Sequence, residues 1–111
     1  MSTHLPFEPE STGSFDPAAI VTQCVESGAE ALLLDRDALP PAFFDLSSGV
    51  LGDLVGRLTL YRIRMAAVVP DLTAHSLPFQ DFVREANRGA QFRFFATRDR
   101  AAEWLSSGEA G

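Results

Sequence analysis

Residues 43–69, FFDLSSGVLGDLVGRLTLYRIRMAAVV, decide the fold of this chain. The segment opens with a polar turn and then places apolar residues at intervals of one, three and four positions from Val50 to Leu58. Those intervals are typical of an amphipathic helix. A β-rich apolar run follows from Ile63 to Val69 and stops at Pro70. A turn, a helix and a buried strand in this order predict the central unit of a small α/β domain.

Helix and strand signals alternate on both sides of this unit. Asp16 and Pro17 are a helix start signal, and Gly28 is a helix stop signal. Strict alternation predicts a single, mostly parallel sheet of three to four strands with right-handed crossovers and flanking helices. We expect helices at residues 17–27, 49–60, 78–88 and 98–106, and strands at residues 31–35, 63–69 and 91–96.

The ends of the chain carry weaker signals. Residues 1–15 and 107–111 are expected to be flexible tails around one domain at residues 16–106. A short strand near His4 to Phe7, or a dimer partner, is expected to cover one edge of the narrow sheet. We expect a nearly fully buried core at Leu33, Leu54, Leu58, Val68, Phe82, Phe94 and Trp104.

Composition limits the classes of function. The chain has 111 residues, 46% apolar content and a formal net charge of −6. The negative charge argues against nucleic acid and against an anionic membrane surface as partners. Membrane-span and signal-peptide patterns are missing, so we expect a cytoplasmic protein. All nine basic residues are arginine, a composition that favours a GC-rich bacterial genome as the source. The single cysteine, Cys24, lies on an apolar helix stripe and is expected to be an inert core thiol.

Candidate site residues follow from the expected topology. Ligands of parallel sheets gather beyond the carboxyl ends of the strands, where Asp35 and Asp71 are expected. Asp45 and His75 lie in the adjoining loops and complete a predicted pocket.

A second candidate is the turn Ser47-Ser48-Gly49, which opens the central helix. Free backbone N–H groups and the helix dipole there favour a phosphate or a phosphoserine. The simpler interpretation is that Ser47 or Ser48 only caps the helix. A hydrolase triad of Ser48, His75 and an aspartate is a third interpretation.

The stretch Glu85-Ala86-Asn87-Arg88-Gly89 also stands out. Its first interpretation is a helix end, with Asn87 bonded to the last carbonyl groups and Gly89 in the left-handed conformation. Its second is a docking surface made of Arg84, Glu85, Asn87 and Arg88. Neither metal-ligand spacing nor a cofactor fingerprint is present, so no metal and no cofactor are predicted.

Four pieces of the chain carry a family resemblance: residues 43–49 (FFDLSSG), the strand entry at 61–69, residues 85–89 (EANRG) and residues 94–105 (FFATRDRAAEWL). Together they resemble the domain-of-unknown-function 4180 family over residues 18–105. More remotely, the order strand, D-x-S-S-G, helix, strand resembles the STAS domain of anti-sigma-factor antagonists. That resemblance implies a serine phosphorylated by a partner kinase at the position of Ser48.

Three hypotheses for function follow. The first is a non-enzymatic protein-interaction or regulatory domain that is switched by phosphorylation at Ser48. The second is a small enzyme or ligand-binding protein that uses the predicted pocket with Ser48. The third is a structural homodimer without a ligand.

Overall fold

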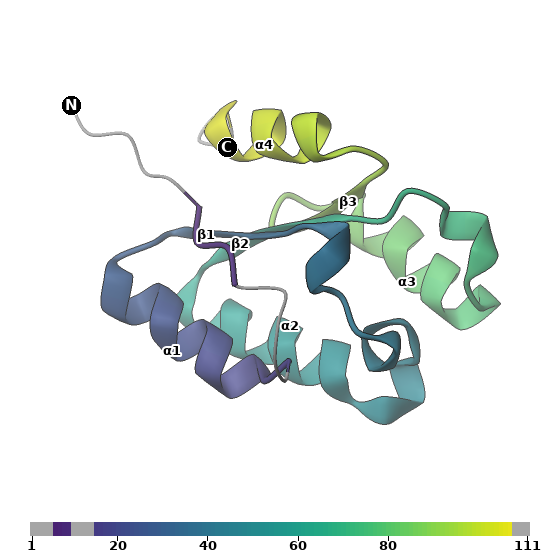
Figure 1. Ribbon diagram of the computed structural model, residues 1–111, viewed down its shortest axis with the longest axis horizontal. Helices are drawn as coiled ribbons and strands as arrows, with labels where there is room; N and C mark the ends of the chain where they lie inside the picture. The colour runs from purple at the N-terminus through teal and green to yellow at the C-terminus, as the bar shows by residue number, and fades with distance from the viewer. Residues whose placement is uncertain (1–5, 10–14, 108–111) are drawn as a thin grey trace.

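The computed structural model of the chain describes residues 6–9 and 15–107 (Figure 1). Helices and strands alternate along this part of the chain, which confirms the α/β prediction. Four short 3-10 turns lie in the connections: η1 (Arg36–Ala38), η2 (Pro41–Phe44), η3 (Leu46–Ser48) and η4 (Leu72–Ala74). The helices are α1 (Pro17–Ser27), α2 (Val50–Tyr61), α3 (Leu77–Ala86) and α4 (Arg98–Ser107), and the strands are β1 (Ala31–Leu34), β2 (Arg64–Val68) and β3 (Phe92–Phe95).

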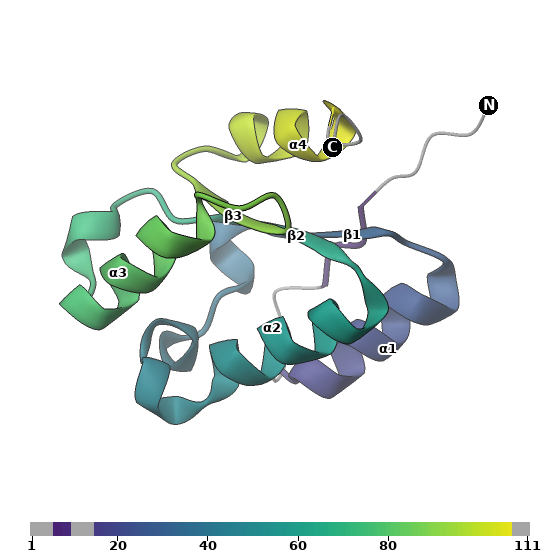
Figure 2. The same cartoon turned by 180° about the vertical axis from the view of Figure 1, so that it is seen from behind.

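The three strands form a fully parallel sheet in the order β1-β2-β3. Each strand therefore pairs with the next strand along the chain. Figures 1 and 2 show α1, α2 and α3 on one face of the sheet and α4 on the other. Every helix in the described part of the chain is too short to cross a lipid bilayer.

Local signals explain where the helices begin and end. The Asp16 carboxylate accepts a hydrogen bond from the backbone N–H of Ala18 at 3.1 Å, and Gly28 ends α1 with φ of 76°. Ser76 caps α3 by accepting from the Phe79 N–H, and Thr97 caps α4 by accepting from the Arg100 N–H. α2 ends at Tyr61, and its capping residue Arg62 holds the left-handed conformation with φ of 57° although it carries a side chain.

Two cores of unequal size hold the layers together. The larger lies between the sheet and α1, α2 and α3, and it includes the fully buried Phe43 from η2. The smaller lies under α4 and contains Leu33, Val68 and Ala101. Chain connections before α2 thus contribute to the main core, because Phe43 packs edge-on against Phe79.

Five of the seven residues expected to be nearly fully buried are buried: Leu33, Leu54, Leu58, Val68 and Phe94. The prediction was wrong for Phe82 and Trp104, which are only partly buried. Phe82 packs edge-on against Phe94 at the margin of the larger core. Trp104 packs against the smaller core from α4, the one described helix on that face, and the guanidinium of Arg64 lies over its ring at 4.1 Å.

The outer edge of β1 is paired with the N-terminal segment through backbone hydrogen bonds. Beside β1, the Phe7 N–H donates to the Ala31 carbonyl oxygen, and the Phe7 carbonyl accepts from the Leu33 N–H, both at 2.9 Å. Phe7 thus lies parallel to β1, as expected of an N-terminal edge segment. His4, where that segment was expected to begin, lies outside the described residues, as do residues 1–5, 10–14 and 108–111 of the predicted tails.

Candidate functional site

The carboxyl edge of the sheet carries the polar residues that the topology predicted there. Asp35 follows β1 directly, and its carboxylate accepts from the Arg36 N–H at 2.8 Å. Asp71 follows β2, and its carboxylate accepts from the Thr73 hydroxyl at 2.7 Å. Both aspartates therefore organise the turns that leave the sheet.

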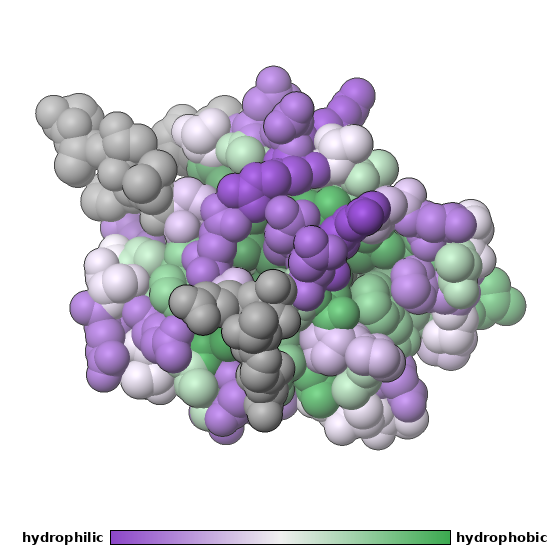
Figure 3. All heavy atoms as spheres, in the orientation of Figure 1, coloured by the Kyte–Doolittle hydropathy of each residue, from purple (hydrophilic) through white to green (hydrophobic). Residues whose placement is uncertain are grey.

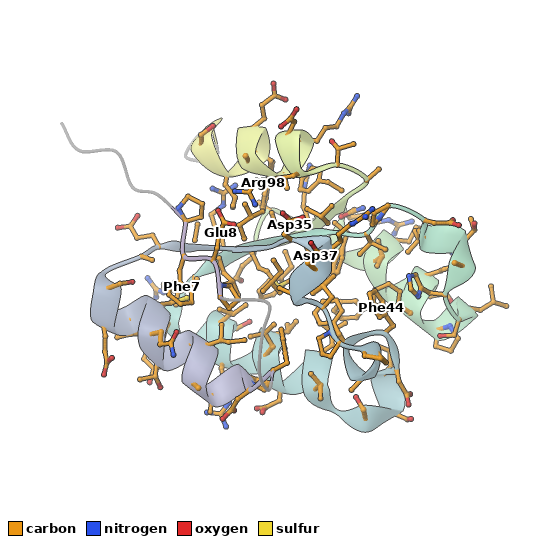
Figure 4. The ribbon with its side chains drawn as sticks, in the orientation of Figure 1. Phe7, Glu8, Asp35, Asp37, Phe44 and Arg98 are labelled. Atoms are coloured by element: carbon orange, nitrogen blue, oxygen red, sulfur yellow. The ribbon has the colours of Figure 1, made fainter. Side chains whose placement is uncertain are left out.

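Asp35 also belongs to an ion-pair cluster that links three distant parts of the chain. The guanidinium of Arg98 donates to both carboxylate oxygens of Glu8, at 2.8 and 2.6 Å, and to Asp35 Oδ2 at 3.0 Å. The two hydrogen bonds to Glu8, and after them the one to Asp35, raise the pKa of Arg98 above its ordinary value. Figure 4 shows the three side chains directed toward one another beside the start of α4.

We call this cluster the Glu8–Asp35–Arg98 clamp. It holds residues 6–9 across the end of β1, and it lies within the hydrophilic surface between α4 and η1 (Figure 3). Sequence reasoning missed it because Glu8 fell in a segment assigned to a tail. The sequence offered only a partial signal: Arg98 begins the helix after β3, so a parallel sheet brings it to the same edge as Asp35, but nothing indicated the pair with Glu8.

The Ser47-Ser48-Gly49 turn is exposed and directly precedes α2. The Ser48 hydroxyl donates to the Ala42 carbonyl oxygen at 2.7 Å and accepts from the Val50 N–H at 3.2 Å. The Ser47 hydroxyl donates to Asp45 Oδ1 at 2.6 Å, and the same oxygen accepts from the Ser47 N–H. Gly49 has φ of 82°, a conformation that favours glycine. The capping residue of α2 is therefore Gly49, which has no side chain, and the interpretation of Ser47 or Ser48 as the helix cap was wrong. Ser48 instead binds the first N–H of α2 from the preceding turn and ties α2 back to η2.

His75 lies in an aromatic cluster. Its ring stacks on Phe44 with centroids 4.0 Å apart and planes 4° apart, and it meets Phe79 edge-on. Its backbone carbonyl accepts from the Gln80 side chain. The contacts described for the side chains of Asp35, Asp45, Asp71 and His75 are with other residues and not with one another. The pocket predicted from these four residues therefore stays a prediction.

Two hollows with defined linings lie elsewhere on the described surface. One, of about 430 Å³, lies between β3 and α4 beside Phe95, Arg100 and Trp104. The other, of about 250 Å³, lies between α1 and α2 beside Val25, Arg57 and Tyr61. No group of three metal-ligating side chains occurs within residues 6–9 and 15–107.

The Glu85-to-Gly89 stretch contacts the edge of the sheet through the side chain of Asn87. Asn87 Oδ1 accepts from the Phe94 N–H at 2.8 Å, and Asn87 Nδ2 donates to the Phe94 carbonyl at 3.5 Å. The side-chain amide therefore pairs with β3 as a neighbouring strand would. The expected left-handed Gly89 was wrong: α3 ends at Ala86, and Asn87 is the capping residue in a right-handed conformation. That turn lets the Asn87 side chain reach β3.

The other members of the predicted docking surface form ion pairs on α3 and just after its end. Arg84 binds Asp81 at 3.0 Å, and Arg88 lies 3.5 Å from Glu85. All four side chains are largely exposed. Pairs of this kind at three-residue spacing stabilise a helix surface only slightly. A docking role for Arg84, Glu85 and Arg88 stays a prediction.

The fold and these contacts define the class: a small open α/β domain with a parallel three-stranded sheet. The sequence model of one family matches residues 11–105, and the chain belongs to that family, described as a domain of unknown function (DUF4180). No curated protein and no solved structure matches the chain. The remote resemblance to STAS domains therefore stays a prediction.

Proposed function

We propose that this chain is a regulatory protein-interaction domain without catalytic activity of its own, and that phosphorylation of Ser48 controls its binding. The observation that carries the proposal is the environment of the Ser48 hydroxyl group. Ser48 is exposed, which a kinase requires, and its hydroxyl joins η2 to the start of α2 through Ala42 and Val50. A modification at this one oxygen therefore acts on two elements.

A phosphate on Ser48 would change both contacts. The ester oxygen has no proton to donate, so the hydrogen bond to the Ala42 carbonyl is lost. The added charge of about −1.5 to −2 is stabilised by the N–H groups at the start of α2. We therefore expect the phosphate to turn toward α2 while η2 is released from it.

Release of η2 would reach the surface through two aromatic residues. Phe43 and Phe44 are both in η2, and Phe44 is half-buried against His75. Phe43 is fully buried and anchors the turn in the larger core, so the fold itself is retained. The surface formed by Phe44 and His75 is thus the part of the molecule that we expect a partner to sense.

The same contacts favour binding over hydrolysis. A serine nucleophile needs a base within hydrogen-bond reach of its hydroxyl. The Ser48 hydroxyl donates instead to a backbone carbonyl, while the His75 ring is stacked on Phe44. We therefore expect a fluorophosphonate probe to leave Ser48 unlabelled. Labelling that disappears in Ser48→Ala would contradict the proposal and favour the hydrolase hypothesis.

The direct test is phosphosite mapping of the chain purified from the cells that naturally make it. We expect phosphate on Ser48 and none on that peptide in Ser48→Ala. Ser47→Ala is the matched control, because Ser47 is the neighbouring exposed serine and its hydroxyl bonds only within its own turn, to Asp45. Phosphate confined to Ser47, or an unmodified turn, would refute the switch.

A second measurement tests the structural consequence. Relative to their intrinsic rates, the Asp45 and Gly49 amides should exchange faster in Ser48→Asp than in the wild type, because they bond within η2 and η3, the turns that Ser48 joins. The melting temperature should change little, since a carboxylate is well tolerated at a helix start. Unchanged exchange in these turns would mean that Ser48 does not control η2.

A further inference from the structure

The outer surface of α1 and α2, which we call the α1–α2 face, has a hollow of about 250 Å³ along its middle. Figures 1 and 2 show the two helices side by side on the far side of the larger core, with no further described element over them. Apolar side chains of α1 form one wall, and α2 forms the other. The lining residues are Ala18, Val21, Thr22, Val25, Glu26, Arg57 and Tyr61.

Large exposed apolar side chains gather on this face. Among the described residues there are four: Val25, Leu60 and Tyr61, exposed by 46, 79 and 58%, and Leu77, exposed by 70%. The first three belong to α1 and α2, whereas Leu77 begins α3. Leu60 lies three residues after Arg57 on α2 and is therefore a neighbour of Arg57 on the helix surface, at the margin of the hollow and outside its lining. The face therefore has an apolar hollow and an apolar protrusion next to each other.

The charged residues of the hollow are complementary to each other. Glu26 lines it from α1 and Arg57 lines it from α2. Arg57 binds Asp53 of its own helix at 2.8 Å and remains about half exposed. In an interface with two-fold symmetry, any residue pair that meets across it meets twice, with the roles exchanged. One acid and one base on opposite walls are therefore complementary to the same face of a second copy.

We propose that the α1–α2 face binds the α1–α2 face of a second copy in a two-fold symmetric dimer. Leu60 of each copy enters the hollow of the other, and Glu26 of each copy meets Arg57 of the other. The inference rests on the proposal that this chain works by binding protein, and it adds a second surface, separate from the one formed by Phe44 and His75, whose partner is another copy of the chain. A second copy fits because hollow, protrusion and both charges are present on one face.

The test measures the mass of the full chain by sedimentation velocity over a concentration series up to about 1 mM, where even weak complexes are populated. The wild type should shift from 12.0 kDa toward twice that mass as the concentration rises. Leu60→Asp should raise the dissociation constant at least tenfold. Leu77→Asp is the matched control, with a similarly exposed leucine on another helix, and it should dimerise as the wild type does.

Charge exchange tests the pairing itself. Glu26→Arg and Arg57→Glu should each weaken the dimer, and the double variant should restore it. Circular dichroism of dilute samples confirms that each variant is folded, since both side chains are at the surface. A wild type that stays at 12.0 kDa throughout, a Leu60→Asp variant that still dimerises, or equal loss in Leu77→Asp would each overturn the inference. A chain that is phosphorylated at Ser48 but stays monomeric would refute the dimer and support the proposed function. A chain that dimerises but has an unmodified or probe-labelled Ser48 would refute the proposed function and support the dimer.

Discussion

At the scale of single residues, polar side chains mainly form hydrogen bonds with backbone groups, several of them in neighbouring elements. Arg64 donates to the carbonyl oxygens of Trp104 and Leu105 near the end of α4, and Gln91 donates to those of Leu58 and Ile63. No polar or charged residue in the described part of the chain is fully buried. These side chains therefore join elements at their ends, where water still reaches them.

Cys24 should make stability depend on alkaline pH. Its side chain is fully buried, and burial raises the pKa of the thiol from 9.0 to about 11. Between these values the unfolded chain loses the proton that the folded chain keeps, so the free energy of unfolding falls as pH rises through this window. We expect a loss of about 2 kcal/mol between pH 8 and pH 11. Urea unfolding of wild type and Cys24→Ala measures it, and an equal loss in both would exclude Cys24 as the cause.

Replacing Arg62 with glycine should stabilise the domain. It holds φ of 57° after α2, where its N–H bonds to the Leu58 and Thr59 carbonyls. A side chain in this conformation costs about 1 kcal/mol that glycine does not incur. Arg62→Gly should therefore raise the free energy of unfolding by about 0.5–1 kcal/mol. Arg36→Gly, in a turn without a positive φ, should lower it, and urea titration of both variants compares the two sites.

At the scale of elements, the outer edge of β3 is paired with the side-chain amide of Asn87 where a further strand would otherwise pair. Asn87 binds both backbone groups of Phe94, so this residue of the edge strand is paired with a side chain. An unpaired edge of four residues that includes three phenylalanines would be a template for aggregation. In the connection between α3 and β3, the side chain of Asn87 therefore stabilises the sheet edge and not the end of the helix.

Asn87→Ala should lower the free energy of unfolding by about 1–2 kcal/mol, because the Phe94 N–H and carbonyl lose their partner. The Phe94 amide should also exchange faster with solvent. Arg88→Ala is the control at the next position, where the side chain makes only an exposed pair with Glu85. Equal effects of the two substitutions in urea titration would show that Asn87 acts only through the helix end.

Elements were predictable because their signals are local. A continuous apolar run defines β1, and Asp16 and Gly28 define both ends of α1. The Glu8–Asp35–Arg98 clamp was not predictable, because its members are 63 and 90 residues apart and exposed residues follow no period. The 3-10 turns before α2 also lack a pattern of their own. The role of Asn87 needed the register of β3, which the sequence alone does not give.

The two cores of the whole molecule should contribute unequally to stability. Leu54 is fully buried in the larger core, whereas Leu105 is half-buried beside the smaller one. Leu54→Ala should cost about 2–5 kcal/mol through lost burial and the remaining cavity. Leu105→Ala should cost roughly half as much, because less apolar area leaves water on folding. Urea unfolding of both variants at pH 7 tests the difference, and equal losses would mean that the layer under α4 is as tightly packed.

From the order of the strands in the sheet we also expect a particular sequence of folding events. Since β1, β2 and β3 pair in chain order, each pairing closes a loop of one helix and needs no distant segment. The exception is the clamp, whose arginine must find a glutamate at the opposite end of the chain. Residues 6–9 should therefore dock last and leave first. The Leu33 amide, bonded to Phe7, should then exchange by local opening while the β2 amides exchange only when the whole domain unfolds.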